Sequence, residues 1–246
     1  MSAIFKREFK SYFTTPIGYV VLAAFYFFLG LFFVNIYSAG APDITSIVIA
    51  MATIIILVLP ILTMRIMSDD RRQKVDQALL TAPVKLTSIV LGKFLAAFAV
   101  FAIGFIPTII FEIIIMSHVT VNIMSFAYAL LGVLLLGGTI IAIGMFISSL
   151  TESAVISAFL TLFVNIIMLF NISAMIPIPS GESKFMQLIT TVVTWFVSVL
   201  DQISFINRFN QFGDNIFSVA DVFYFLSVTA IFLFLCVRSL EKRRWA

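Results

Sequence analysis

Residues 68–83 read SDDRRQKVDQALLTAP, a long polar interruption between two apolar runs. Ser68 or Asp69 can cap a helix start, and Asp70 suits a first helical turn because acids are favoured near a helix N-terminus. Pro83 ends the segment because it lacks an N–H and disfavours helix at the preceding residue. The pattern therefore predicts a short helix over residues 69–82.

This predicted helix has one apolar face, since Val75, Ala78, Leu79 and Ala82 fall at helical spacing. An apolar stripe on a short helix beside a membrane indicates that the helix docks into a groove on a partner protein. A solvated loop with no special role is the alternative interpretation, and the residues alone leave both open.

Composition identifies a polytopic membrane protein. The chain has 246 residues, of which 62% are hydrophobic and 11% charged, and its mean hydropathy is +1.16. A soluble domain of this length cannot bury so much apolar surface in one core. The single cysteine, Cys236, excludes an internal disulfide.

The apolar runs predict an all-α membrane domain with six transmembrane helices. Phe5 and Phe9 lie on one face of the first helix, with Lys6, Arg7 and Lys10 on the other, which is typical of a helix lying flat in the membrane interface. A signal peptide is the alternative, but the run that follows is longer than a signal core of ~7–15 residues. The expected spans are residues 17–37, 44–66, 88–117, 123–148, 154–176 and 222–237.

Charge sets the expected topology. With six crossings, both termini and residues 68–83 share one side, together with thirteen of the fifteen Lys and Arg residues; only Lys184 and Arg208 lie opposite. Cytoplasmic loops are enriched in Lys and Arg, so we expect both termini in the cytoplasm. Residues 185–200 are short for a crossing, where ~20 are needed, so we expect an external re-entrant segment over 183–212.

The sequence lacks the motifs of an enzyme or a metalloprotein. It has no phosphate-binding GxxxxGK[ST] loop, no Cys/His metal spacing, and His118 is its only histidine. We therefore predict no catalytic, cofactor-binding or metal-binding residue and no nucleic-acid partner. Glu112 is the one acid within an expected span, which makes it either a candidate pathway residue or an interfacial or cavity-facing acid.

The order of these segments resembles the membrane subunit of ABC-2 type transporters across nearly the whole chain. In this family, two acids, basic residues, a leucine run and a proline often follow the second span. The matching residues are Asp69, Asp70, Arg71, Arg72, Leu79, Leu80, Thr81 and Pro83. Lys74, Val75 and Gln77 depart from the usual glycine, threonine and glutamate. Residues 144–159 resemble the family's turn between the fourth and fifth spans, and both ends of the chain look closest to its gliding-motility-type branch.

The resemblance implies a single transmembrane domain over residues 1–246 that is the non-catalytic permease of an ATP-binding cassette exporter in the cell inner membrane. Residues 69–82 would be the coupling helix, which docks in a cleft of a separate ATPase. Its contact residues would be Asp69, Asp70, Arg71, Arg72, Val75, Leu79, Leu80 and Pro83. Two ATPase copies would hold the ATP and Mg, and a second permease would complete a homodimer or heterodimer.

Two other classes of protein fit the composition. An ion-coupled secondary carrier or channel would work without ATP, and acids near mid-bilayer together with paired broken helices would support it. A scaffold for a membrane complex would need neither feature. A stoichiometric soluble partner with a phosphate-binding loop favours the transporter over both.

Overall fold

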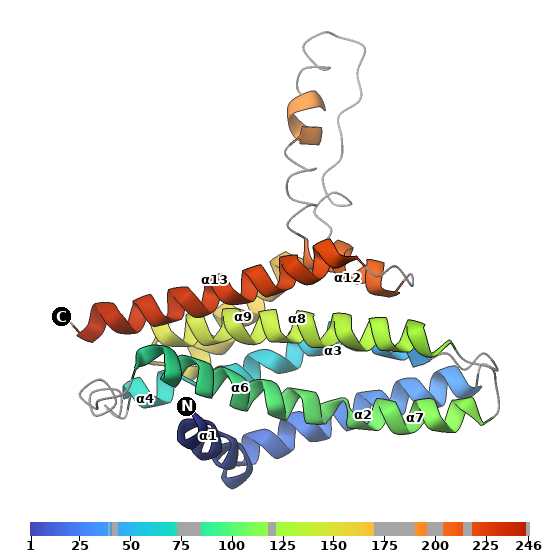
Figure 1. The fold of residues 1–246 in the computed structure, drawn as a ribbon, viewed down its shortest axis with the longest axis horizontal. Helices are drawn as coiled ribbons and strands as arrows, with labels where there is room; N and C mark the ends of the chain where they lie inside the picture. The colour runs from blue at the N-terminus through green and yellow to red at the C-terminus, as the bar shows by residue number, and fades with distance from the viewer. Residues whose placement is uncertain are drawn as a thin grey trace.

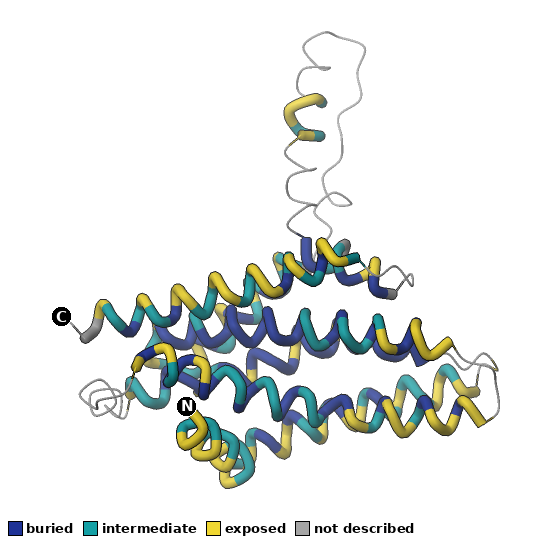
Figure 2. The backbone as a smooth tube through the Cα atoms, in the orientation of Figure 1, coloured by how far each residue is buried: buried dark blue, intermediate teal, exposed yellow. Residues whose placement is uncertain are grey.

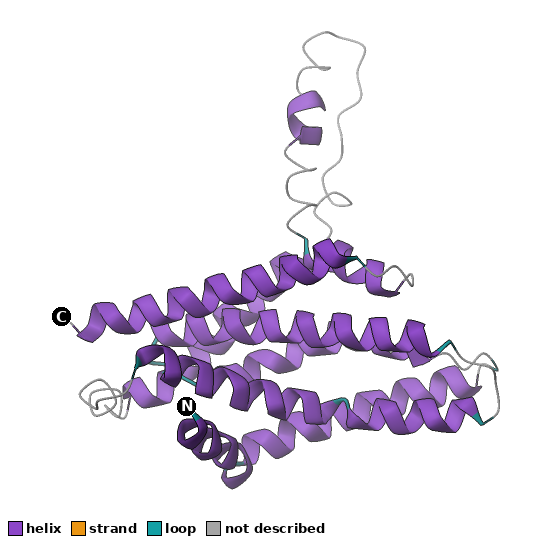
Figure 3. Ribbon diagram, in the orientation of Figure 1, coloured by secondary structure: helices purple, strands orange, loops and turns teal. Residues whose placement is uncertain are grey.

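Helices make up all the secondary structure of the described residues (Figure 3). The computed structural model describes residues 1–38, 40, 44–72, 85–117, 122–169, 190–195, 204–213 and 218–244. The helices are α1 (Ser2–Thr14), α2 (Pro16–Ser38), α3 (Ile44–Thr63), α4 (Ser68–Arg72), α6 (Leu86–Gly104), α7 (Ile106–Met116), α8 (Ile123–Leu150), α9 (Ala154–Leu169), α12 (Phe205–Gly213) and α13 (Val219–Arg244).

Five helical stretches are long and apolar enough to cross a membrane, and each of them overlaps one of the expected spans. They are Pro16–Ser38, Ile44–Arg72, Leu86–Met116, Ile123–Leu150 and Val219–Lys242. The fifth expected span, residues 154–176, is described only as far as Leu169, so α9 is a shorter apolar helix. The last span is longer than expected, because the basic tail continues as helix to Arg244.

The third expected span is one apolar stretch built from two helices. α6 ends at Gly104, Phe105 forms the joint, and α7 begins at Ile106 with Pro107 in its first turn. Proline is tolerated there because the first N–H groups of a helix have no partner within it. The Gly104–Pro107 pair therefore marks a real interruption, whereas Pro60 lies inside α3.

α3 and α8 form the centre of the bundle, and α2 and α13 lie outside them (Figure 1). Burial follows this arrangement: α3 and α8 are largely buried, whereas α2 and α13 are largely exposed along their apolar faces (Figure 2). Those exposed faces suit contact with lipid, because lipid chains are as apolar as the side chains.

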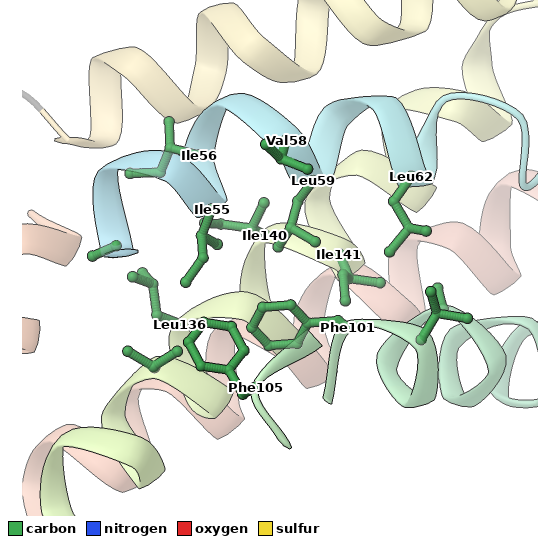
Figure 4. Packing of buried hydrophobic residues seen from close by; sticks show 14 of the residues in the cluster. Ile55, Ile56, Val58, Leu59, Leu62, Phe101, Phe105, Leu136, Ile140 and Ile141 are labelled. Carbon is green, nitrogen blue, oxygen red and sulfur yellow. The ribbon is translucent and has the colours of Figure 1, made fainter. Parts of the chain in front are cut away.

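The centre of the bundle is a contact of aliphatic and aromatic side chains from α3, α6 and α8 and from Phe105, the joint between α6 and α7 (Figure 4). α3 presents branched residues to rings of α6 and to aliphatic residues of α8. The labelled residues are Ile55, Ile56, Val58, Leu59, Leu62, Phe101, Phe105, Leu136, Ile140 and Ile141. All of them are buried.

Glycines in α8 allow this close packing. A Cβ placed on Gly137 would overlap the ring of Phe101, and one on Gly144 would overlap the Thr63 side chain. Small residues at such positions let neighbouring helices approach without loss of contact. Gly30 in α2 differs, because a Cβ there would meet nothing within 4 Å.

We therefore expect Gly137→Ala to destabilise the bundle and Gly30→Ala to leave it unchanged or slightly more stable. The ring of Phe101 is fully buried, so overpacking should cost ~1–3 kcal/mol. Alanine at Gly30 gains helix propensity of up to ~1 kcal/mol. Thermal midpoints of both variants in the same lipid nanodiscs test this; equal midpoints would contradict the close contact.

Both termini and α4 lie toward one end of the bundle (Figure 1). We call this the charged end; it comprises α1, α4, the start of α6, the turn between α8 and α9, and the C-terminal part of α13. At the opposite end, α12 packs against α8, with Phe205, Phe209 and Phe212 buried. Of the expected re-entrant segment 183–212, only residues 190–195 and 204–212 are among those described.

Candidate functional site

The stretch that begins at Ser68 starts as the expected helix, α4, which the structure describes from Ser68 to Arg72. Residues 73–84 lie outside the described residues, so the predicted contacts Val75, Leu79, Leu80 and Pro83 cannot be located. The four residues Asp69 to Arg72 are among the described residues, and their side chains point to three different parts of the bundle.

The start of α4 is fixed by Ser148 of α8. The backbone N–H groups of Met67 and Ser68 donate to Ser148 Oγ at 3.1 and 3.0 Å, and that hydroxyl donates to Met64 O at 3.1 Å. The expected cap at Ser68 is wrong, because Ser68 Oγ donates backward to Met64 O. A buried side chain of another helix thus satisfies N–H groups that a short helix leaves unpaired.

Asp70 binds a buried lysine near the start of α6. Lys93 Nζ lies 2.8 Å from Asp70 Oδ2 and 3.3 Å from Glu8 Oε1, and donates to Ile66 O at 2.7 Å. The Lys93 side chain is 1% exposed. An ammonium has three donors, and three acceptors from α1, α4 and the 64–67 turn surround this one. We call Lys93, Glu8 and Asp70 the Lys93 node.

Arg71 points away from the Lys93 node, toward the turn between α8 and α9. Its Nη1 donates to Leu150 O at 2.7 Å, and its Nε lies 2.9 Å from Glu152 Oε1. Hydrogen bonds between charged groups are about twice as strong as neutral ones. Adjacent residues of α4 are therefore bound to two different parts of the bundle.

Asp69 and Arg72 make looser contacts. Asp69 lies 3.9 Å from both Arg65 and Arg72, and the Arg72 side chain is 69% exposed. Exposed pairs at this separation contribute at most ~1 kcal/mol. Arg72 remains available at the surface, whereas Asp70 and Arg71 bind within the chain.

α1 packs against the start of α6 and has two chemically distinct faces. The rings of Phe5, Phe9 and Phe13 contact one another in sequence along one side, the first pair stacked and the second tilted, while Lys6 and Lys10 are exposed on the other. The Tyr12 hydroxyl donates to Leu62 O at 3.3 Å, and burial raises the pKa of this phenol.

Arg7 completes the polar face of α1 by pairing with Glu8, and that hydrogen bond raises the pKa of Arg7. The same Glu8 carboxylate reaches Lys93, so α1 joins the Lys93 node through its polar face. A cavity of about 230 Å³ opens beside the node, and its walls include Glu8, Ser11, Tyr12, Arg65, Asp70 and Lys93.

Glu112 lies apart from this cluster. It is on α7, its residue is 4% exposed, and it is therefore buried inside the protein rather than at a surface. Among the residues that the structure describes, no group of three His, Cys, Asp or Glu side chains is arranged to hold a metal ion.

A second buried ion pair lies at the opposite end of the bundle. Arg208 Nη1 of α12 donates to Asp221 Oδ1 of α13 at 2.7 Å; the side chain of Asp221 is 0% exposed and that of Arg208 is 28% exposed. The guanidinium also lies over the Tyr224 ring, 5.0 Å from its centroid. This pair holds α12 against the start of α13.

Sequence reasoning missed Lys93, Glu8, Ser148 and Glu152 as part of the site. The sequence did contain a signal for Lys93, because a lysine inside an apolar run needs an acidic or carbonyl partner. The sequence could not say which of the acids in the chain supplies it.

A multi-pass helical membrane protein with its ionic contacts gathered around a short helix after the second span is the class that this fold and site define. The chain belongs to the ABC-2 type transporter family, whose sequence model matches residues 1–205. No curated protein matches the chain.

Family membership makes this chain a non-catalytic membrane component of an ABC transporter. It also implies association with an ABC ATPase. The coupling residues expected from the resemblance lie within the matched part of the chain.

Proposed function

We propose that this chain is one of two permease subunits of an exporter, and that residues 69–82 dock on a separate ATPase. The observation that carries the proposal is the double attachment of α4. Asp70 binds Lys93 of α6 and Arg71 binds the turn between α8 and α9. A helix that transmits force from a partner needs firm contacts to the spans that it moves.

This attachment suits rigid-body motion. Closure of two ATPases around ATP would displace the docked helices, and charge-assisted bonds would carry the displacement into the attached spans. The exposed Arg72 would lie nearer the ATPase. α1 would rest in the membrane interface, since Lys6 and Lys10 are exposed and suit contact with lipid headgroups.

The direction of transport, the pairing of two permeases and the gliding-motility-type branch rest on sequence resemblance in residues 69–83 and 144–159 and at the chain ends. The termini are proposed to be cytoplasmic because the charged end carries most of the basic residues. The membrane would be the cell inner membrane.

A pull-down from native membranes tests the proposal. Tagged permease should recover a soluble protein with a phosphate-binding loop in stoichiometric amount. An ion-coupled carrier or a scaffold would recover no such protein, so its absence from otherwise intact complexes would overturn the proposal.

Topology has its own test by cysteine labelling in a Cys236→Ser background. A cysteine at Gln211, exposed on α12, should react with an impermeant thiol reagent in intact cells. Cysteines at Gln73 and Ala246 should react only after the membrane is opened, because both are proposed to be cytoplasmic. External labelling at Ala246 would defeat the six-span arrangement.

A further inference from the structure

The Lys93 node joins three segments that are far apart in the chain. Glu8 comes from α1, Asp70 from α4 and Lys93 from α6, and the Ile66 carbonyl supplies the third acceptor. The two carboxylates are partly exposed, at 17% and 21%, whereas the ammonium is 1% exposed. The lysine is thus the buried centre, and the acids approach it from the cavity side.

Such a centre resists separation of its parts. Moving Asp70 away would leave a buried ammonium with fewer partners, and removing one partner from a buried ion pair is strongly unfavourable. When α4 is displaced, Lys93 and Glu8 are therefore expected to move with it, because this costs less free energy than breaking the contact between Asp70 and Lys93. The 3.9 Å contacts of Asp69 do not resist separation in this way, because their arginine partners, Arg65 and Arg72, are exposed to solvent.

α1 and α6 are also locked together beside the node. A Cβ on Gly92, the residue before Lys93, would lie 3.0 Å from Ile4 Cγ2, so the two helices are already in close contact. α1 makes its most extensive contact with α6. A pull on Lys93 would therefore carry α1 as well as α6.

We propose that Lys93 is a positioning residue that transmits displacement of residues 68–72 to α1 and α6, separately from the path through Arg71 to the α8–α9 turn. This inference rests on the proposed coupling to an ATPase. It assigns the N-terminal helix to the moving part of the permease, and it separates transmission at Lys93 from the docking of residues 69–82 on the ATPase.

The experiment uses the permease–ATPase complex in lipid nanodiscs, with one cysteine at Ser11 in a Cys236→Ser background. Ser11 is exposed on α1 and borders the cavity beside the node. The labelling rate is compared between the nucleotide-free complex and the complex trapped with ATP and vanadate. We expect the rate to change on trapping in the otherwise unaltered chain.

Two variants test the node. Lys93→Met removes the ammonium, and the triple variant Lys93→Met, Asp70→Asn, Glu8→Gln also neutralises the acids left behind. The triple variant should fold, because replacing a complete buried ion cluster by neutral groups of similar size is often tolerated. Both should lose the change in labelling rate, and Lys93→Met, which leaves every proposed docking residue in place, should recover ATPase as well as the parent.

Arg238→Met with Glu241→Gln is the matched control, since it neutralises an exposed ion pair of α13. It should retain the change. A change that persists in both variants overturns the inference, and so does loss of ATPase recovery in Lys93→Met, which would make the node part of docking. Failure of the unaltered chain to recover any ATPase would instead contradict the proposed function, and this inference would fall with it.

Discussion

We expect a permease that carries Leu79→Asp and Leu80→Asp to lose its ATPase on purification while it still inserts into the membrane. Burying a leucine side chain is worth ~1.5–3 kcal/mol, so losing one can weaken docking roughly tenfold or more. Aspartate adds the cost of placing a charge in an apolar groove. Insertion should survive because both residues lie outside every span expected from the sequence.

The measurement is the amount of ATPase recovered per tagged permease at equal expression. Arg71→Ala with Arg72→Ala is the matched variant and should reduce recovery less. Arg71 is engaged with Leu150 O and Glu152, and Arg72 is largely exposed. Undiminished recovery with both leucines replaced would remove residues 69–82 from the role of coupling helix.

The second large effect is expected at the opposite end of the bundle. Arg208→Met should destabilise the protein by ~3–5 kcal/mol, because it leaves the Asp221 carboxylate buried without its partner. Among the described residues, Asp221 Oδ2 has no hydrogen-bond partner even with the arginine present. The thermal midpoint in nanodiscs reports this loss.

Two further variants separate charge from packing. Arg208→Met with Asp221→Asn should recover much of the lost stability, because no uncompensated charge remains. Arg238→Met should cost less than ~1 kcal/mol, since its partner Glu241 and the arginine itself are exposed at 37% and 63%. A single Arg208→Met variant as stable as the parent would show that the buried pair is dispensable.

The sequence by itself determined the class of protein and most of its helices. The first and fourth spans, expected at 17–37 and 123–148, are α2 and α8 with ends shifted by a few residues. This succeeds because a chain crossing lipid must satisfy its backbone hydrogen bonds internally and needs ~20 apolar residues, and both requirements are local. The same reasoning does not give the end of α13 (Val219–Arg244). Hydropathy falls where lysines and arginines begin, but these residues continue a helix readily.

Only the tertiary structure determined which charged residues pair with one another. The sequence predicted Asp69 to Arg72 as one group that contacts a partner. In the folded chain, Asp70 binds Lys93 and Arg71 binds the α8–α9 turn. Folding likewise brings Glu8 to Lys93 and Arg208 to Asp221. Pairing between distant residues depends on which helices pack together and in what register, and steric details such as Gly92 against Ile4 set that packing.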